Sequence, residues 1–366
     1  MCRSAPKLIA ERSKFLHNSA IKNSRKSRVS AASINPPQKT DIRLGQIVRL
    51  LMDHATMVVS GTKIAEEIGT SRSEIWRLVQ QLRRLGVHVA GHPATGYQLR
   101  AVPDLLLPDI LAPLVKGTIF SKNIHHYYKV ASTNTAAMDA AAAGAPEGTV
   151  FLAEEQTGGR GRGAHKWHSA RSSGIYCSVV LRPALPPSEV LLLSLAAGLA
   201  VRRAVRDIGP GLKPDLKWPN DLLLDGRKFC GILTEMNAEA TRVRHLVIGI
   251  GINVNQASFP SDVQDQATSL RSHTGSEWSR VEVTAALLKS LHQEYRDFLE
   301  KPNARESILS RFCEHSSFAR GRSVRVEENG EFEGVTEGLD ARGFLKVRAS
   351  DGVRTVLSGT VRPLSG

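Results

Sequence analysis

The sequence predicts a multidomain α/β (α+β) protein: a winged helix-turn-helix first, a mixed sheet in the middle and a small β-barrel last. Three stretches with different hydrophobic patterns support this division into domains. Apolar residues recur at helical spacing from 41 to 85, short apolar strands alternate with helices from 118 to 317, and single apolar and polar residues alternate from 318 to 366. The length of 366 residues is enough for two or three domains.

Residues 1–40 form a basic arm ahead of the first domain. They hold nine Lys and Arg and one acidic residue, Glu11, in a chain whose total net charge is +14. No sustained apolar period runs through the arm, which favours disorder. Contact with DNA phosphates or an acidic partner, an organelle transit peptide and a mis-assigned start codon are alternatives that the sequence leaves open.

Cysteine spacing and apolar segments narrow the class of protein. Cys2, Cys177, Cys230 and Cys313 are far apart and form no C-x-x-C pair. A disulfide scaffold is therefore not expected, whereas a reducing, cytoplasmic setting is. The apolar run 190–201 contains a serine and is shorter than the ~20 residues that cross a bilayer, so we expect a buried helix and no membrane partner.

Residues 41–101 have the pattern of a winged helix-turn-helix domain. Two helices come first. Ser71 and Glu74 then form a capping box, in which each side chain satisfies a backbone donor of the other, at the start of a third helix. Two short strands, 87–89 and 97–99, flank a turn with glycine and proline and would form the wing.

The outer face of the third helix is the expected DNA-contacting surface. Arg72, Ser73, Arg77 and Gln80 lie on its first turns, where a recognition helix reaches base edges and phosphates. A small helical domain that binds protein, or nothing, is the alternative, because surface Arg and Gln are usually just solvated. The order of the helices and the wing favours DNA binding.

A Pro- and Leu-rich connector, 102–117, leads to the central domain, 118–317. Ser132, Thr133 and Asn134 stand there at the start of an alanine-rich helix. Their hydroxyl and amide groups, beside free backbone N–H groups, suit a small polar heterocycle, although Ser-Thr-Asn is more often merely an N-cap.

Strands and one long helix are expected in the rest of the central domain. The helix is capped by Ser188 and runs to about Asp207, and Asp225 begins a two-residue hairpin turn with the glycine that follows. The strands are expected at 149–156, 173–183, 229–236 and 247–255, with another ending at Pro219.

Glycines and cations are the groups left to carry the chemistry. No P-loop, complete Rossmann fingerprint, H-E-x-x-H, G-x-S-x-G or acidic metal loop occurs. What remains is Arg160, Arg162, Lys166 and Lys217 beside a glycine-rich stretch, 154–169. Arginine forks, a lysine point charge and Mg²⁺ together suit the activation of a carboxylate by ATP.

Four runs of the central domain together resemble the biotin–protein ligases. They are GRGRGAHKW at 159–167, KWPND at 217–221, RKFCGIL at 227–233 and GIGINVN at 249–255. With the winged helix, the resemblance is to the bifunctional type, which is both a biotin ligase and a biotin-operon repressor, and it covers about residues 41–366. It implies a central sheet of the class II synthetase-like type and an SH3-like domain at 318–366.

The resemblance also implies roles for individual residues, and it leaves the metal ligands open. Biotin would be bound by Ser132, Thr133, Asn134, Gln156, Gly159, Arg160, Gly161, Arg162 and Lys217. ATP or the adenylate would be bound by Arg160, Arg162, Lys166, Trp167, Lys217, Asn220 and Asn253. Lys217 and Arg162 would be the catalytic residues.

A two-step reaction follows from the resemblance. Biotin and Mg-ATP would give biotinyl-5′-AMP, and a lysine of a biotin carboxyl carrier protein, the acetyl-CoA carboxylase subunit, would take the biotin. A homodimer in the adenylate-bound state and operator DNA would complete the partners. The alternatives are a biotin-sensing regulator with little ligase activity and a ligase whose winged helix no longer binds DNA. Gly163, Ala164 and His165 depart from some relatives, which have Arg or Gly there, and predict a looser loop.

Several of these residues have a plainer structural interpretation. Trp167 and Trp218 would then be core residues only, and Asn220 and Asp221 would form a turn. Glu154 and Glu155 are expected to be solvated rather than catalytic.

Overall fold

The computed structural model describes residues 39–101, 104–328 and 330–364. The basic arm up to residue 38 lies outside the described residues, so its alternatives stay open. Within the described part, no helix has the length and apolar character needed to cross a membrane.

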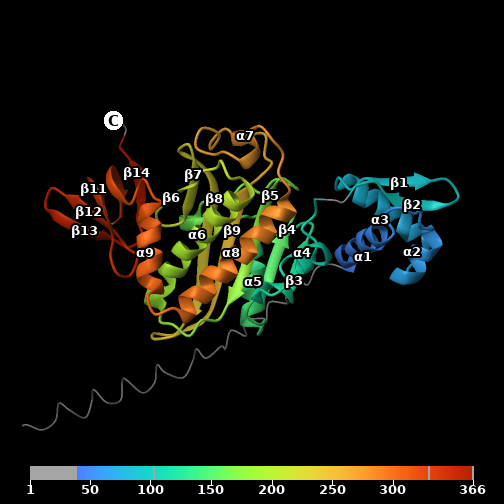
Figure 1. The fold of residues 1–366 in the computed structure, drawn as a ribbon, viewed down its shortest axis with the longest axis horizontal. Helices are drawn as coiled ribbons and strands as arrows, with labels where there is room; N and C mark the ends of the chain where they lie inside the picture. The colour runs from blue at the N-terminus through green and yellow to red at the C-terminus, as the bar shows by residue number, and fades with distance from the viewer. Residues whose placement is uncertain (1–38, 102–103, 329, 365–366) are drawn as a thin grey trace, which may run out of the picture. The chain divides into compact units, whose positions relative to one another are not determined.

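Three helices and a two-stranded wing form the first domain (Figure 1). The elements are α1 (Lys39–Asp53), α2 (Gly61–Ile68), α3 (Arg72–Arg84), β1 (Val89–His92) and β2 (Gly96–Leu99). The apolar faces of the three helices pack into one buried cluster, as their helical periodicity predicts. The first wing strand lies further along the chain than the predicted range 87–89. The pairing extends to His92 and Gly96, so only a short turn separates the two strands.

Side-chain caps define the starts of α2 and α3. The Ser60 hydroxyl accepts from the Lys63 N–H, and the Ser71 hydroxyl accepts from the Glu74 N–H. Only this half of the predicted capping box forms, because the Glu74 carboxylate accepts from the Arg77 guanidinium instead.

A seven-stranded mixed sheet, in the order β3-β4-β5-β9-β8-β7-β6, forms the central domain. Its strands are β3 (Ile124–Tyr127), β4 (Val150–Ala153), β5 (Gly174–Leu181), β6 (Asp215–Lys217), β7 (Asp221–Leu224), β8 (Arg227–Ala238) and β9 (Val243–Asn253). β3 and β4 are parallel, and every other pair is antiparallel. The predicted two-residue turn between β7 and β8 forms at Asp225 and Gly226, both with positive φ.

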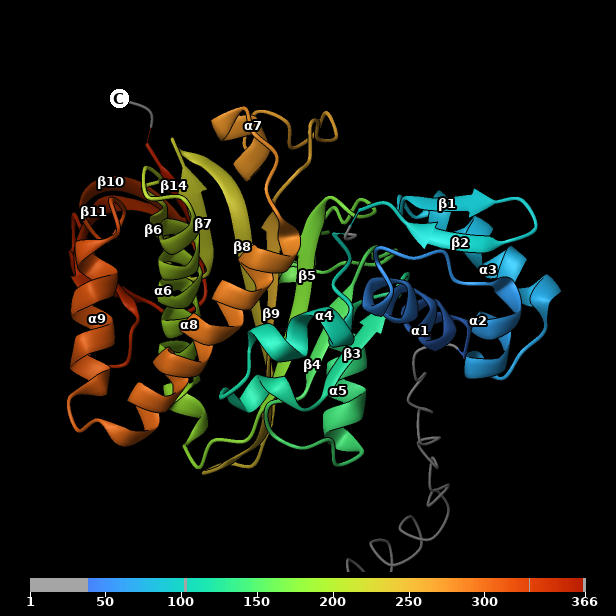
Figure 2. The ribbon, with the colours of Figure 1, turned by 45° about the vertical axis from the view of Figure 1, so that its right-hand side comes forward.

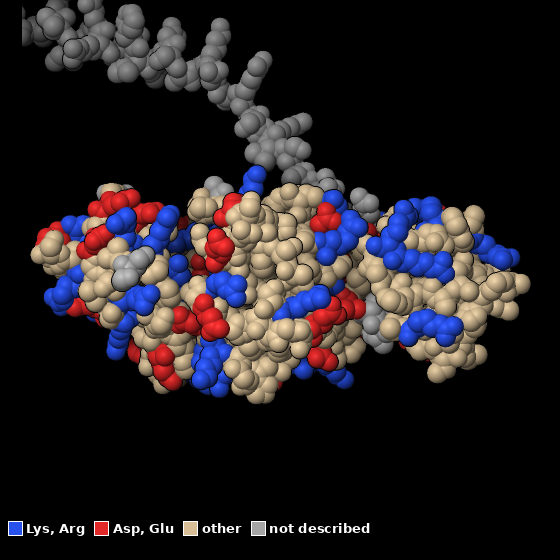
Figure 3. Space-filling view, turned by 90° about the horizontal axis from the view of Figure 1, so that it is seen from above, with Lys and Arg blue, Asp and Glu red and all other residues tan. Residues whose placement is uncertain are grey.

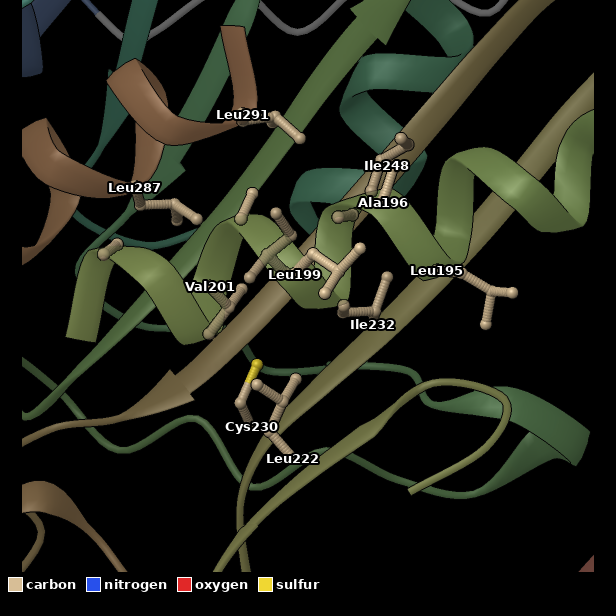
Figure 4. Packing of buried hydrophobic residues seen from close by; sticks show 14 of the residues in the cluster. Leu195, Ala196, Leu199, Val201, Leu222, Cys230, Ile232, Ile248, Leu287 and Leu291 are labelled. Atoms are coloured by element: carbon tan, nitrogen blue, oxygen red, sulfur yellow. The ribbon is translucent and has the colours of Figure 1, made fainter. Parts of the chain in front are cut away.

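Helices cover both faces of this sheet (Figure 2). On one face, α6 (Val190–Ile208) and α8 (Arg280–Glu300) bury most of the apolar side chains. Figure 4 shows side chains of α6 packed against Ile232 and Ile248 of the sheet and against Leu287 and Leu291 of α8. On the other face, α5 (Thr133–Ala142) covers a smaller cluster, which leaves room for polar groups there.

One local prediction is wrong in this domain, and the predicted connector contains a short helix. Ser188 does not cap α6, because Pro187 begins a single 3₁₀ turn ahead of the helix and Glu189 precedes the first helical residue without a side-chain cap. The stretch predicted as a connector contains α4 (Pro108–Leu114), which a proline starts. The remaining helices are the 3₁₀ turn η1 (Ile119–Ser121), α7 (Leu270–Thr274) and α9 (Ala304–Glu314).

Five antiparallel strands form the last domain, where the alternating pattern predicts a small β-barrel. They are β10 (Arg320–Glu327), β11 (Glu331–Leu339), β12 (Leu345–Ala349), β13 (Gly352–Val356) and β14 (Thr360–Pro363), in the order β13-β12-β11-β10-β14. Their buried side chains, such as Val324 and Val347, belong to the same cluster as those of α6.

Candidate active site

A polar cradle lies at the N-terminal end of α5. The Thr133 N–H and hydroxyl both donate to Oε1 of Gln156, at 2.8 and 3.1 Å. The Ser178 hydroxyl, on the neighbouring strand β5, lies 2.8 Å from Thr133 Oγ1 and 2.6 Å from Asn134 Oδ1. Gln156 Nε2 donates to the Ser169 hydroxyl at 2.9 Å. These donors and acceptors form one connected set at the start of a helix, where the Thr133 N–H is part of the set.

Asn134 is held between α5 and the sheet. Its Nδ2 donates to the Leu233 carbonyl at 3.1 Å and to Glu235 Oε2 at 2.9 Å. Gly249 permits this approach, because a Cβ there would overlap the Asn134 side chain. The Asn134 side chain is therefore fixed in place, and Gly249 is required because any larger side chain there would collide with it.

Trp167 lies on a second pair of sheet glycines. Gly231 and Gly251 are register partners on β8 and β9, and a Cβ on either would come within 2.9 and 2.5 Å of the indole. The ammonium of Lys228 is 5.5 Å from the ring centroid. The indole Nε1 is buried without a hydrogen-bond partner among the described residues. Trp167 thus packs flat over a glycine floor and has one donor to offer to a ligand.

The glycine-rich stretch forms a closed loop between β4 and β5. Trp167 N donates to the Gly159 carbonyl at 2.9 Å, and Gly161 N donates to the His165 carbonyl at 2.6 Å. Gly163, at φ +63°, makes the reversal that most other residues would make at a cost. Arg160 extends from this loop to Glu235 Oε2, at 2.7 Å, so the loop and the cradle share a carboxylate.

Three cations gather around Asp221. The ammonium of Lys228 is 2.6 Å from Asp221 Oδ1, and Asp221 also acts on the charges of Lys217 and Arg162. Burial lowers the pKa of Lys217, and Asp221 opposes that effect. Burial lowers the pKa of Arg162 in the same way, with Asp221 and Glu328 opposing it. Cations that are partly removed from water and outnumber their carboxylate attract an anion more strongly than solvated ones.

Lys217 and Arg162 also touch the last domain. The Lys217 ammonium is 5.4 Å from the centroid of the Phe318 ring. Arg162 donates to the Ser358 carbonyl, and Glu328 accepts from the N–H groups of Leu357 and Ser358. The two residues predicted to be catalytic therefore lie where the central and last domains meet.

Some predicted ligand residues have structural partners instead. Asn220 Nδ2 donates to the Ile232 carbonyl, and Asn253 Nδ2 donates to that of Thr268. Ser132 caps α5 by accepting from Thr135 N, as the plainer interpretation has it. Lys166 is exposed. Any role of these four toward a ligand stays a prediction.

Trp218 fits its structural interpretation. It is buried, and its indole N–H donates to the Gly343 carbonyl at 2.9 Å, which connects the KWPND run to the last domain.

Glu154 is not solvated: the expectation is wrong. Its side chain is fully buried and accepts from Arg280 at 2.7 Å, from the Leu106 N–H at 3.0 Å and from the Ser172 hydroxyl at 3.2 Å. Burial alone would raise the pKa of this carboxyl, but the charge of Arg280 and the hydrogen bond with His126 outweigh it and lower the pKa to about 2. The partners are distant in sequence, so local pattern contains no sign of them.

Other residues of the site also escaped the sequence reasoning. Ser178 and Glu235 occupy ordinary strand positions, where a polar residue usually faces solvent. Lys228 lies inside the run 227–233. It precedes the buried Phe229, and because neighbouring strand residues face opposite sides of a sheet, this position indicated that Lys228 faces the site. Ser169 lies two residues after the GRGRGAHKW run, and the resemblance assigns it no role.

The predicted DNA-contacting residues lie together on α3. Arg77 makes two bonds to Glu74, at 2.6 and 2.8 Å, and Ser73 Oγ is 2.9 Å from Ser71 Oγ. A shallow groove along the helix is lined by Trp76, Arg77, Gln80, Arg83 and Arg84. In Figure 3 the visible face of the winged-helix part, at the right, carries Lys and Arg patches and almost no Asp or Glu.

Comparison with known proteins agrees with this arrangement. The family model described as "Biotin/lipoate A/B protein ligase family" matches residues 127–253, the one described as "HTH domain" matches 43–98, and the one described as "Biotin protein ligase C terminal domain" matches 320–362. The chain is 34% identical over 318 residues to the bifunctional ligase/repressor BirA of Bacillus spizizenii, which covers 86% of this chain and 97% of the relative.

The chain belongs to the biotin protein ligase family. This ligase is also 29% identical over 303 residues to the bifunctional ligase/repressor BirA of Escherichia coli, covering 82% of this chain and 92% of the relative. Among solved structures, it resembles the biotin protein ligase of Aquifex aeolicus in complex with biotin and ATP. That match has a TM-score of 0.58 and 31% identity, and it covers 66% of this chain and 100% of the other.

Proposed function

We propose that this ligase joins biotin to ATP and then transfers biotin to one lysine of a biotin carboxyl carrier protein. The observation that carries the proposal is the arrangement of two neighbouring sets of groups. The cradle of Thr133, Gln156 and Ser178 offers donors and acceptors to a small polar ring, and the cations Arg162 and Lys217 lie near Asp221, where a phosphate would meet them. A substrate with a ureido ring at one end and a carboxylate at the other fits both sets.

In the first step, a carboxylate oxygen of biotin attacks the α-phosphorus of ATP, and the bond from that phosphorus to the bridging oxygen breaks to release pyrophosphate. Lys217 holds the carboxylate and neutralises phosphate oxygens, and Arg162 stabilises charge that grows on them. Partial burial of both side chains strengthens the attraction between their positive charges and the phosphate.

In the second step, the Nζ of the carrier lysine attacks the carbonyl carbon of the mixed anhydride. AMP leaves, an amide bond forms, and the lysine loses a proton. The loop that contains Gly159, Gly161 and Trp167 would cover the adenylate between the steps and keep water from it. No covalent bond to the enzyme is needed.

Mg²⁺ belongs to the proposal as the ion that ATP brings. Among the described residues, no group of three or more His, Cys, Asp and Glu side chains could hold a metal ion. Mg²⁺ at nucleotide phosphates commonly takes one or two protein carboxylates and keeps several waters, so a protein cage is not required. Asp221 is the carboxylate nearest the cation set and would be its contact.

The test of the ligase is a mass measurement on the carrier. Purified protein is incubated with biotin, Mg-ATP and a biotin carboxyl carrier domain, and the carrier is expected to gain the mass of one biotinyl group at one lysine. Controls omit ATP or replace the acceptor lysine by arginine. An unchanged carrier mass, with pyrophosphate release also at background, would exclude the proposal.

We further propose that the winged helix represses biotin synthesis genes when the adenylate is bound. The basic outer face of α3 supports phosphate and base contacts, because Arg77, Gln80, Arg83 and Arg84 line its groove and Arg72 is its first residue. A homodimer in the adenylate-bound state would place two such helices on a two-fold symmetric operator.

Binding to upstream DNA tests the repressor role. The DNA upstream of the biotin synthesis genes and a random DNA of equal length are compared at several salt concentrations, with and without biotin and Mg-ATP. We expect tighter binding to the upstream DNA in the presence of both substrates. Equal affinity for the two DNAs would leave a ligase alone, and biotin-dependent DNA binding without carrier labelling would leave a biotin-sensing regulator.

A further inference from the structure

Both ends of the glycine-rich loop meet at one residue. β4 ends at Ala153, and the next residue, Glu154, begins the excursion that returns at Ser172. Ser172 N donates to the Glu154 carbonyl at 2.9 Å, and the Ser172 hydroxyl donates to Glu154 Oε2 at 3.2 Å. Residues 155–171 are therefore closed at their base by Glu154 and Ser172, which we call the loop anchor, and the ion pair of Glu155 with Arg171, at 3.0 Å, lies next to it.

Ser172 has a backbone conformation that its side chain disfavours. Its φ is +51°, in the left-handed region that residues with a Cβ enter at a cost. Such a conformation persists only where the surroundings hold it, and it concentrates at functional sites. The two bonds to Glu154 are the contacts that hold it here.

Glu154 is an unusual residue to find at this place. Its side chain is 0% exposed and that of Arg280, the first residue of α8, is 1% exposed. Arg280 also donates to the side chain of Asp104 at 3.1 Å and to its carbonyl. A buried ion pair adds little net stability, because the cost of desolvating the two charges offsets most of their attraction. The hydrogen bonds of Glu154 are directional, so a role in holding Ser172 explains the pair better than stability does.

The anchor lies close in sequence to the groups of the cradle. Gln156 is two residues after Glu154, and Ser169 is three residues before Ser172, and these two form a 2.9 Å hydrogen bond across the loop. Gln156 in turn receives both bonds from Thr133. A change in the anchor would therefore reach the cradle through Gln156 on one side of the loop and Ser169 on the other, past the ion pair of Glu155 with Arg171. Arg160, Arg162 and the glycines lie further along the loop.

We propose that Glu154, held by Arg280, is a positioning residue that keeps the base of the loop closed through Ser172 and so sets how long the acyl-adenylate stays in the site. This rests on the ligase proposed above and adds a determinant of its retention step. Glu154 touches no substrate in this scheme. Its influence passes through Ser172 and Gln156.

The decisive variant is Ser172→Ala, which removes the hydroxyl and leaves the buried ion pair intact. Adenylate made in a single turnover should leave the variant roughly 3- to 10-fold faster than the unaltered protein, in line with the ordinary net contribution of one hydrogen bond. Pyrophosphate release in that turnover should change little, because Lys217 and Arg162 are untouched. Ser173→Ala is the matched control, since that hydroxyl donates to the Ala170 carbonyl and not to the anchor.

A second readout needs neither biotin nor ATP. Trypsin cleaves after Arg160 and Arg162, both within the loop, and mass spectrometry reads the cleavage rate at those two bonds. We expect several-fold faster cleavage in Ser172→Ala and an unchanged rate in Ser173→Ala. Glu154→Gln combined with Arg280→Gln, which removes both charges and the guanidinium bonds but keeps polar side chains, should raise the cleavage rate further.

The two readouts separate this inference from the proposed function. If the unaltered protein makes no adenylate, the ligase proposal fails, and the trypsin rates still decide the anchor. If Ser172→Ala is cleaved at the rate of the unaltered protein, the anchor does not close the loop and the inference is overturned. Faster cleavage together with unchanged adenylate retention overturns it as well.

Discussion

The recognition helix α3 and the glycine-rich loop are both rich in arginine, but they hold their arginines in different ways. In α3, Arg77 pairs with Glu74 three residues away, and Arg83 donates to the carbonyl of Val89, six residues away. In the loop, Arg160 pairs with Glu235 and Arg162 bonds to Ser358, which are 75 and 196 residues distant. The base of the loop depends on Arg280, 126 residues from Glu154.

This difference separates two ways of presenting positive charge to phosphate. A helix repeats its outer face every turn, so the places of Arg72, Arg77 and Gln80 follow from their numbers. A loop has no repeat, so each cation is placed by a contact with another part of the chain. The helix should therefore tolerate changes at single contacts, whereas the loop and its neighbours should not.

The largest effect is expected at the cation set beside the loop. Lys217→Ala should lower the rate of adenylation by about 100-fold or more, the usual loss when a preorganised contact to developing charge is removed. Pyrophosphate release measures the rate, and thermal unfolding checks that the fold is retained. DNA binding by α3 in the absence of substrates should not change. Turnover close to that of the unaltered protein would show that Lys217 has no role in catalysis.

The second effect is the acid sensitivity of the buried ion pair of Glu154 with Arg280. The pKa of Glu154 is lowered to about 2 in the folded chain from 4.5, so its contribution to stability is complete above pH 4.5 and is lost as pH falls toward 2. The loss amounts to about 3 kcal/mol in the free energy of unfolding. Urea unfolding at several pH values measures it.

The variant that carries both Glu154→Gln and Arg280→Gln supplies the control for the acid experiment. It has no charge to lose at this place, so its stability should fall less steeply between pH 4.5 and 2. Parallel curves for the two proteins would mean that the buried pair does not control acid sensitivity.

The third effect concerns retention by the loop. Arg162→Gly removes the bond to Ser358 and one cation, so the adenylate should escape about 10-fold faster, as expected for a lost hydrogen bond of a charged group. Biotin attached to amines of an added unrelated protein reports the escape. Arg354→Ala, which removes an exposed arginine of the last domain paired with Asp351, serves as the control. Unchanged labelling of the added protein would contradict a closing role for Arg162.

The smallest effect is expected on α3. Glu74→Gln frees Arg77 and removes a negative charge from the face that would meet phosphate, so affinity for upstream DNA should rise about 2- to 5-fold. Stability should change little, because the pair is exposed. Fluorescence anisotropy at one fixed salt concentration measures the affinity. Weaker binding by the variant would instead show that Glu74 orients Arg77 for contact.

Much of the fold was predictable because its patterns are local. Ser60, Ser71 and Gly69 mark helix ends through bonds to residues three or four positions away, and the five strands of the last domain follow from alternation. The prediction that Ser188 caps α6 was wrong, because the neighbouring proline starts a 3₁₀ turn that includes Ser188. The helix α4 was missed because leucines and prolines without a clear period resemble a connector.

The candidate site was predictable only in part. The runs around Arg160, Arg162 and Lys217 pointed to a carboxylate-activating site, but Ser178, Glu235 and Lys228 occupy strand positions whose facing depends on the neighbouring strand. Glu154 was misjudged, because an acidic residue at a strand end is normally solvated.

The sequence alone determined the order of the three domains, the recognition helix with its outer arginines and the family resemblance of the four runs, because each depends on spacing along the chain. The tertiary structure decided which residues surround the glycine-rich loop. Gly231 and Gly251 form a floor for Trp167 only because two strands place them side by side, and Glu154 is buried only because Arg280 reaches it from α8. A charge can be removed from water at low cost only where a distant partner meets it, and that partner is set by the fold.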